Sequence, residues 1–154
     1  MPREIVVDAS VLVEFLVPGR LEAEADSLLD ALAWTEPLVL LAPDLVLIEA
    51  GNALRGAALR KEVSPKDADR AARRLGQLPI ATVPSGALLE DAWRLSGQMT
   101  AYDAAYVALA LGLRLPFVTE DHRLAGAARR AGAEAYELDS TALARFLETH
   151  QPSR

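Results

Sequence analysis

The sequence predicts a three-layer α/β/α domain with a central, mostly parallel sheet of four to five strands. Short apolar runs rich in β-branched residues alternate along the chain with longer stretches rich in Ala, Leu, Arg and Glu. This alternation is typical of parallel strands that are joined by helical crossovers. Of the 154 residues, 51% are apolar and 25% are charged, which suffices for one buried core. We therefore expect one domain over residues 1–150, followed by a tail over residues 151–154.

Five short apolar runs are the expected strands, at residues 5–7, 38–41, 80–83, 117–119 and 135–138. Continuous apolar runs are typical of strands that are buried on both faces. Because crossovers between parallel strands are right-handed, the stretches between the runs should cover both faces of the sheet as helices.

Capping residues mark where the expected helices begin. Asp44 is the candidate N-cap of a helix over about 45–61, and Ser64 of one that starts at Pro65. Ser85 is the candidate N-cap of a helix to about residue 97, and Thr100 of one to about residue 112. A further helix is expected from about residue 121 to Gly132, where a glycine can end it.

Composition excludes several functional classes. With no Cys there is no disulfide framework, no thiolate zinc site and no cysteine nucleophile. Two histidines, His122 and His150, are too few for a multi-histidine metal site. No apolar run approaches the roughly 18 residues of a membrane helix, and Asp8 interrupts the first run before a signal-peptide core could form. We therefore expect a cytoplasmic protein with no membrane span.

Charge is distributed unevenly along the chain. The 22 acids and 16 bases give a formal net charge of −6, which taken alone argues against binding nucleic acid through bulk electrostatics. Residues 55–74, however, hold seven bases and only three acids. Arg55, Arg60 and Lys61 begin this stretch. They are candidates to contact phosphates, and the alternative is a solvated pair of helices.

Asp8 and Glu49 are the first two of four acids near the boundaries of expected elements. Asp8 directly follows the first strand, where it belongs either to a site or to the N-cap of the next helix, a position that Ser10 could also fill. Glu49 lies within the apolar stretch 45–54, one helical turn from Asn52. Its carboxylate therefore needs a cation or hydrogen-bond donors, and the alternative is an ion pair with a nearby arginine.

Asp103 and Asp121 are the other two acids. Thr100 and Asp103 have the spacing of a capping box, so Asp103 can support a helix and still bind a metal. Asp121 follows the fourth strand, where the helix dipole also favours an acid. The neighbouring Glu120 competes with Asp121 for any role.

Jointly, the four acids predict a metal site. Three of them follow or adjoin parallel strands, so they should meet at one edge of the sheet, and Glu49 should face the same place. Carboxylates this close repel one another unless a positive charge lies between them. In a chain without Cys, the expected ion is a hard one held by oxygen, Mg²⁺ or Mn²⁺. This chemistry indicates metal-assisted hydrolysis of phosphodiester bonds.

The same residues carry a resemblance to the PIN-domain ribonucleases, and among them to the VapC-type toxins of toxin–antitoxin pairs. The resemblance runs from Ile5 to about Phe146. Its four motifs are residues 7–12 with Asp8, 43–54 with Glu49 and Asn52, 102–110 with Asp103, and 119–124 with Thr119 and Asp121. In the last motif the family pattern selects Asp121 over Glu120.

The resemblance implies an endoribonuclease that depends on Mg²⁺ or Mn²⁺, forms a homodimer and is inhibited by a small antitoxin protein. Carried over by position, Asp8 and Asp103 would be the main metal ligands, and Glu49 and Asp121 would complete the acidic pocket. The supporting polar groups would be Ser10, Asn52 and Thr119. The metal would polarise the scissile phosphate of an RNA substrate and lower the pKa of an attacking water. His122, beside the site, is expected to be a structural or solvent-facing imidazole.

Two other functions compete with this one. A PIN-like scaffold could bind RNA or a partner protein without cutting. Phosphoaspartyl chemistry needs Asp-x-Asp after the first strand and a nearby lysine, whereas Asp8 is followed by Ala9 and Ser10, and the only lysines are Lys61 and Lys66. A receiver-type signalling domain is disfavoured for similar reasons.

The first two helices are more apolar than one buried face requires, which predicts a dimer and a groove for an antitoxin. The alternative is a thick core. The residues concerned are Val13, Phe15, Leu16, Leu28, Leu29, Leu32 and Trp34.

Overall fold

One parallel sheet of five strands forms the centre of the computed structural model, which describes residues 3–17, 19, 21–33 and 37–151. The strand order is β3-β2-β1-β4-β5, and every neighbouring pair is parallel. All five expected strands are confirmed to within two residues at each end, but the prediction that each is buried was wrong for residues 80–83, which form an edge strand with Ala81 and Thr82 exposed. Their bounds are Arg3–Val7 (β1), Leu38–Pro43 (β2), Ile80–Val83 (β3), Phe117–Thr119 (β4) and Ala135–Glu137 (β5).

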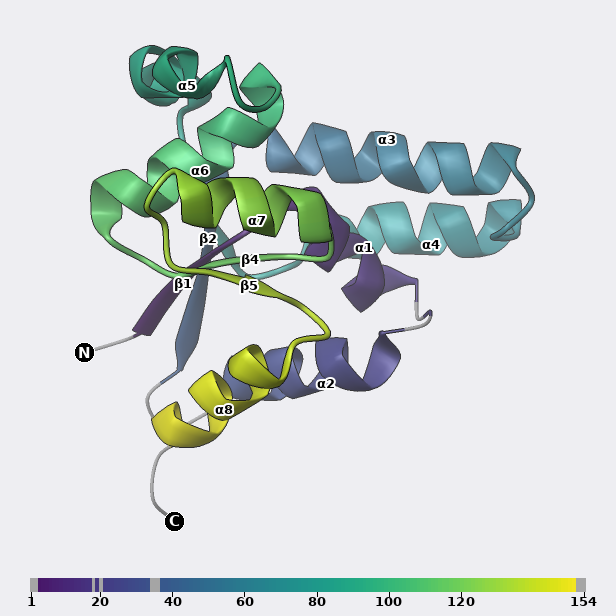
Figure 1. The fold of residues 1–154 in the computed structure, drawn as a ribbon. Coiled ribbons are helices and arrows are strands. Elements are labelled where there is room, and N and C mark those ends of the chain that lie inside the picture. The colour runs from purple at the N-terminus through teal and green to yellow at the C-terminus, as the bar shows by residue number, and fades with distance from the viewer. Residues whose placement is uncertain (1–2, 18, 20, 34–36, 152–154) are drawn as a thin grey trace.

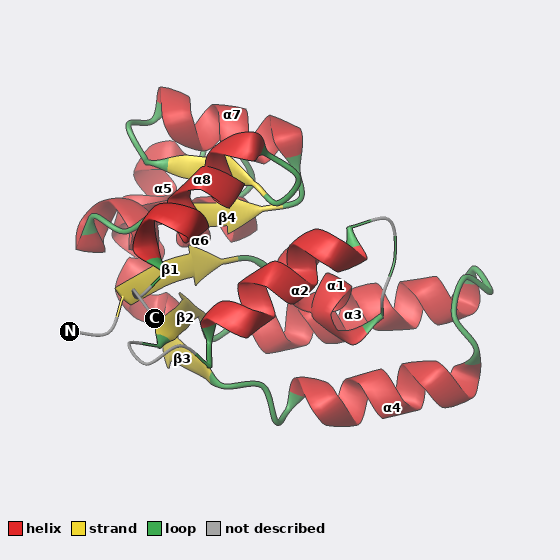
Figure 2. Ribbon diagram, turned by 90° about the horizontal axis from the view of Figure 1, so that it is seen from below, coloured by secondary structure: helices red, strands yellow, loops and turns green. Residues whose placement is uncertain are grey.

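Helices cover both faces of the sheet and confirm the three-layer α/β/α prediction. Figure 1 shows α6 and α7 above the sheet and α2 and α8 below it. In Figure 2, α3 and α4 form an arm that extends away from the strands. Within the described residues, no helix is both long and apolar enough to span a membrane. The helices are Ala9–Leu16 (α1), Glu22–Ala31 (α2), Val46–Leu59 (α3), Pro65–Leu75 (α4), Leu89–Leu95 (α5), Ala101–Leu113 (α6), His122–Arg130 (α7) and Thr141–His150 (α8), with a 3₁₀ turn at Ser85–Leu88 (η1).

The central strand β1 is apolar because it is enclosed on every side. Val6 pairs with Leu41 of β2 on one side and with Phe117 of β4 on the other. All three side chains lie in the main core, and those of Val6 and Phe117 are completely buried. A strand buried on both faces shows no alternation of polar and apolar residues, which is the pattern seen in the sequence.

The predicted helix ends are confirmed in part. Ser64 and Thr100 are N-caps whose side chains accept hydrogen bonds from the backbone, and Gly132 follows α7 with a φ of +98°. The predictions for Asp44 and Ser85 were wrong. Asp44 accepts hydrogen bonds from the backbone N–H and hydroxyl of Ser85, so it joins the end of β2 to the start of η1 instead of capping α3. Ser85 begins η1 and caps no helix with its side chain.

The apolar residues of the first two helices belong to the protein's own core. Phe15, Leu16 and Leu28 are buried in it, and Val13, Leu29 and Leu32 pack against it. Trp34 lies outside the described residues. A thick core therefore accounts for the described members of this set, and the dimer and the antitoxin groove stay predictions that this packing does not test.

The connections of the sheet place a crevice at one edge. The chain passes from β1 to β2 and β3 on one side, then crosses back to β4 and β5 on the other side of β1. In open parallel sheets, ligands bind beyond the carboxyl ends of the strands at such a reversal. The residues that follow β1 and β4 therefore stand at this reversal and are the first candidates for a site.

Candidate active site

Asp8 stands at the carboxyl end of β1 and is held by both of its oxygens. It is the N-cap of α1, and its side chain is buried, with the residue 7% exposed. Oδ1 accepts hydrogen bonds from the backbone N–H of Ser10 at 3.1 Å and of Val11 at 3.4 Å, and from the Ser10 hydroxyl at 2.5 Å. Oδ2 accepts a hydrogen bond from the Thr119 hydroxyl. Asp8, and not Ser10, is therefore the helix cap.

Two of the predicted supporting residues join the ends of β1 and β4 around Asp8. The Thr119 Oγ1 atom accepts a hydrogen bond from the backbone N–H of Asp121 at 3.0 Å, and its side chain is completely buried. The Ser10 hydroxyl oxygen accepts one from the backbone N–H of Glu120 at 3.0 Å. The two strand ends are thus fixed relative to each other by side chains that both contact Asp8.

Burial makes the charge of Asp8 costly. It raises the pKa of this carboxyl from 3.8 to about 6, although the hydrogen bonds from Ser10, Thr119 and Val11 act in the opposite direction. These donors favour the ionised form but offset only part of the desolvation. A nearby cation would supply the remaining stabilisation, which is the electrostatic condition that a metal ligand meets.

Glu49 reaches the same region from α3. Its Oε1 accepts a hydrogen bond from the hydroxyl of Tyr106 on α6, at 2.7 Å. Burial raises the pKa of Glu49, the Tyr106 bond lowers it, and the charge of Asp103 raises it again. The predicted alternative, an ion pair with an arginine, is not formed by Arg60, which pairs with Glu62 at 2.7 Å.

Asp103 and Asp121 stand at the first turns of α6 and α7. Burial raises the pKa of Asp103, a hydrogen bond with the Thr100 side chain lowers it, and the Asp121 charge raises it. Asp121 is the N-cap of α7, and its Oδ1 accepts hydrogen bonds from the N–H groups of Arg123 at 2.9 Å and Leu124 at 3.1 Å. Both acids therefore support helices, as predicted, and their carboxylates interact with each other.

The four acids offer oxygen donors, the ligand type that hard divalent cations prefer. Glu49 interacts electrostatically with Asp103, and Asp103 with Asp121, while the charges of Asp8, Glu49 and Asp103 all act on Tyr106. Among the described residues, no group of three or more Asp, Glu or His side chains is placed to hold a metal ion. Mg²⁺ commonly keeps several waters and uses only one or two carboxylates, so a pair of these acids is enough for the proposed ion.

The other predicted residues lie along α3 and just beyond its end. Asn52 is exposed one turn beyond Glu49, and Arg55 is exposed further along α3. Arg60 and Lys61 stand at the far end of α3, about 16 Å beyond Glu49 at 1.5 Å per residue.

The remaining polar groups favour neither a histidine base nor phosphoaspartyl chemistry. His122 is exposed and pairs with Asp139 at 2.9 Å, which agrees with a structural imidazole. Lys61 and Lys66 both lie where α3 turns into α4, so no lysine stands at the carboxyl end of β1.

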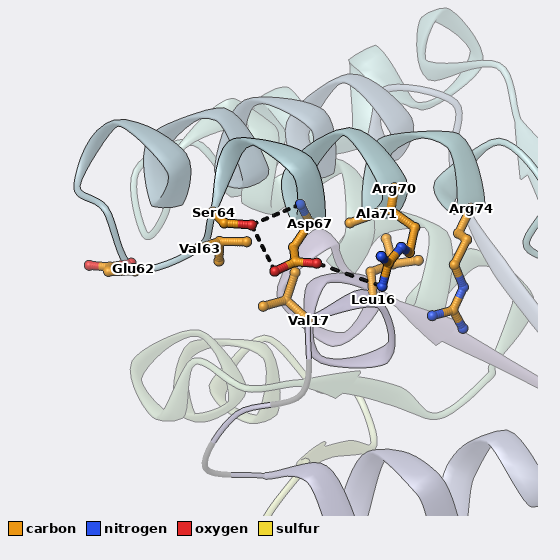
Figure 3. A pocket seen from close by; sticks show the side chains of 9 residues that line it. All are labelled: Leu16, Val17, Glu62, Val63, Ser64, Asp67, Arg70, Ala71 and Arg74. Carbon is orange, nitrogen blue, oxygen red and sulfur yellow. Dashed lines mark hydrogen bonds and ion pairs between the residues drawn. The ribbon is translucent and has the colours of Figure 1, made fainter.

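A separate hollow lies between the end of α1 and the start of α4. Its volume is about 420 Å³, and none of the four acids lines it. Figure 3 shows Asp67 joined to Ser64 and Arg70 along one wall, with Leu16 and Val17 of the first helix region facing them. This hollow is therefore distinct from the region of the four acids.

Known protein families match most of the chain. Residues 5–130 match the PIN domain. The chain belongs to the PIN-domain family. Ribonuclease VapC1 of Mycobacterium tuberculosis is 38% identical over 125 residues, which are 80% of this chain and 90% of that protein.

Solved structures agree with this assignment. PAE2754 from Pyrobaculum aerophilum is 26% identical, with a TM-score of 0.66, and the alignment covers 97% of this chain and 100% of that one. Mycobacterium tuberculosis VapC20, described as a toxin that cleaves the sarcin-ricin loop, shares the fold with a TM-score of 0.60 at 18% identity. That alignment covers 84% of this chain and 95% of VapC20. The resemblance predicted from the sequence is confirmed.

One residue of this PIN domain was missed by the sequence reasoning. Within the described residues, Tyr106 makes the only hydrogen bond that the structure shows for the side chain of Glu49. A signal was present, because Tyr106 lies one turn after Asp103 in an otherwise apolar helix, and a buried phenol needs a hydrogen-bond partner. The partner itself is 57 residues away, which spacing could not reveal.

Proposed function

We propose that this PIN-domain protein is a metal-dependent endoribonuclease that hydrolyses phosphodiester bonds of RNA and acts as the toxin of a toxin–antitoxin pair. The proposal is supported by the electrostatic effects that link the four acids: Asp103 acts on Glu49, Asp121 acts on Asp103, and Asp8, Glu49 and Asp103 all act on Tyr106. Burial raises the pKa of three of these acids. The identity to Ribonuclease VapC1 supports RNA as the substrate.

The metal that we propose is Mg²⁺ or Mn²⁺. Asp8 and Asp103 would be its main ligands, and Glu49 and Asp121 would complete the pocket, directly or through water. Four oxygen donors without sulfur or imidazole suit these ions. When bound, the ion would supply Lewis acidity to a phosphate and lower the pKa of water.

The protein's own side chains would fix the orientation of the reacting groups. Ser10 and Thr119 hold the two oxygens of Asp8, so this carboxylate cannot turn away when RNA arrives. Tyr106 occupies Oε1 of Glu49, which leaves Oε2 available to accept a proton from water or to orient it. Such preorganised groups need no rearrangement during the reaction, and this lowers its barrier.

RNA would extend beyond the acids along α3. We propose that Arg55, Arg60 and Lys61 contact phosphates at a distance from the cleavage point, with Asn52 between them and Glu49. Because Arg60 already pairs with Glu62, and both side chains are exposed, Arg60 would have to exchange a weak surface ion pair for a phosphate.

The proposed partners are an antitoxin protein and a second copy of this chain, and the proposed location is the cytoplasm. The likeness to Ribonuclease VapC1 and to the toxin VapC20 supports an antitoxin. Purification with the product of the adjacent gene, followed by light scattering, tests both partners. A monomer that does not bind the adjacent gene product would contradict them.

A cleavage assay tests the proposed activity. Purified protein is incubated with total RNA in Mn²⁺, in Mg²⁺ or in EDTA, and the 5′ ends of the fragments are sequenced. We expect cleavage that stops in EDTA and that falls at least 100-fold in Asp103→Asn. Asp26→Asn, a change at an exposed carboxylate of α2, is the matched control and should cut normally.

Two results would count against the proposal. Full cleavage in EDTA or by Asp103→Asn would exclude the metal mechanism. RNA binding without any cleavage in Mn²⁺ would favour the alternative of a PIN-like scaffold that binds RNA or a partner.

A further inference from the structure

A polar cleft of about 480 Å³ lies between the start of α6 and α7, and two of the four acids are among its lining residues. Asp103 and Asp121 line it on the side of the proposed metal. Arg123 and Arg130 of α7 line it further along, and Gln98 contributes an amide from the segment before α6. The cleft therefore passes from negative to positive charge over a short distance.

Arg123 is placed to act beside the reacting centre. It is exposed, and its positive charge lowers the pKa of Asp103, so the guanidinium lies within electrostatic range of that carboxylate. In the part of the chain that the structure describes, Arg123 makes no ion pair. Its hydrogen-bond donors are thus available to a ligand in the cleft.

Arg130 lies one helical turn after Gly126, a glycine that also lines the cleft. The Nη1 atom of Arg130 lies only 3.3 Å from the position that a Cβ on Gly126 would take. The guanidinium therefore lies back along α7, against the backbone of Gly126. Glycine within a helix costs about 1 kcal/mol relative to alanine, and here it leaves room for a cationic group against the helix.

We propose that this cleft binds the RNA strand next to the scissile bond, with Arg123 and Arg130 holding backbone phosphates that flank the one at the acids. The proposal rests on the endoribonuclease function proposed above and names the path of its substrate. A guanidinium binds a phosphate through two parallel hydrogen bonds, which fixes orientation as well as charge. A strand held in this way presents its next phosphate to Asp103 and its neighbours.

The charge balance of the protein favours this path. A chain with a net charge of −6 repels RNA in general, so a few cations close to the acids must hold the phosphates next to the cleaved one. Arg60 and Lys61 stand at the far end of α3, whereas Arg123 and Arg130 line the same cleft as Asp103 and Asp121. The arm and the cleft therefore serve different stretches of one strand.

Binding of single-stranded RNA by charge variants tests the inference. A fluorescein-labelled, random-sequence 20-nucleotide RNA is titrated with protein in Ca²⁺ while anisotropy is recorded, and a gel verifies that the probe stays intact. The variants are Arg123→Ala, Arg130→Ala and the double variant. Arg145→Ala, an exposed arginine on α8, is the matched control.

We expect each single variant to weaken binding about tenfold, which corresponds to the loss of one charged hydrogen-bonded contact. The slope of log Kd against log salt should fall by about 0.7 for each lost phosphate contact. Cleavage in Mn²⁺ should show a raised KM with kcat little changed. Thermal melts should match those of the wild type, because both side chains are exposed.

Unchanged affinity and salt dependence in the double variant would overturn the inference, as would a wild type that does not bind the probe. Cleavage reports separately on the proposed function. A wild type that binds RNA through Arg123 and Arg130 but does not cut it in Mn²⁺ supports this binding path and refutes the nuclease. A wild type that cuts RNA while the double variant keeps the same KM refutes the path alone.

Discussion

Replacing Asp8 by Asn should stabilise the protein when no metal is present. Asn keeps the shape of the side chain and an oxygen that can accept the N–H groups of Ser10 and Val11, but it carries no charge. Burial raises the pKa of Asp8 from 3.8 to about 6. At 1.36 kcal/mol per pKa unit, the ionised carboxylate costs the folded state about 3 kcal/mol at neutral pH.

The pH dependence of this effect has a definite sign. The raised pKa means that the folded state binds the proton more tightly than the unfolded state, so the contribution of Asp8 to stability is fully present below about pH 4. It is lost as the pH rises to about 6. The difference in unfolding free energy between Asp8→Asn and wild type should therefore be near zero at pH 4 and reach about 2–3 kcal/mol at pH 7.5.

Urea unfolding in EDTA, followed by circular dichroism from pH 4 to 8, measures this difference. Asp26→Asn is the control and should show no such dependence on pH. In saturating Mn²⁺ the order should reverse, because the cation binds the carboxylate of the wild type and stabilises its folded state. A variant that is less stable than wild type at pH 7.5 in EDTA would refute the reasoning. It would mean that the hydrogen bonds alone satisfy the charge.

Three further substitutions have definite expected outcomes. Thr119→Val removes the buried hydroxyl that donates to Asp8, so it should lower the free energy of unfolding in urea by about 1–3 kcal/mol and slow RNA cleavage at least tenfold. Thr119→Ser should restore much of both. Tyr106→Phe removes the bond that favours ionised Glu49, so the acidic limb of the pH–rate profile should move to higher pH; an unmoved limb would exclude a titrating role for Glu49. Gly132→Ala places a side chain at a φ of +98° and should lower the free energy of unfolding by about 1 kcal/mol or more, without changing the cleavage rate. Loss of cleavage in this variant would indicate a wider structural change.

The fold could be predicted because its signals are local. Strands buried on both faces give continuous apolar runs, and the alternation with helices leaves little choice but a parallel sheet. The caps at Ser64 and Thr100 could be predicted for the same reason, because each bonds to a backbone N–H three residues later.

Long-range contacts explain where the prediction of the fold failed. Asp44 has the residue type of a helix cap, but it binds Ser85, which is 41 residues away. The sequence around one residue of such a pair does not indicate which residue is its partner. Composition also cannot distinguish a partner surface from a thick core, because both need apolar side chains. Only the packing of residues such as Phe15 and Leu28 separates them.

The places of the acids relative to the sheet could be predicted, whereas the groups that shift their pKa values could not. Asp8 and Asp121 follow parallel neighbouring strands, so their positions at one edge of the sheet follow from topology. The Thr119 bond to Asp8 spans 111 residues, and the cationic cleft depends on how α7 turns its arginines. These contacts depend on packing that spacing along the chain does not encode.

The position of a bound metal ion tests the central claim most directly. A crystal soaked in Mn²⁺ and measured at the manganese absorption edge would show an anomalous peak at every ordered ion. We predict a peak at the carboxyl edge of the sheet within ligand distance of Asp8 or Asp103, and no such peak in Asp103→Asn at the same concentration. The absence of a peak at the carboxyl edge of the sheet in saturating Mn²⁺, or an ordered ion bound only elsewhere, would contradict a metal site at these acids.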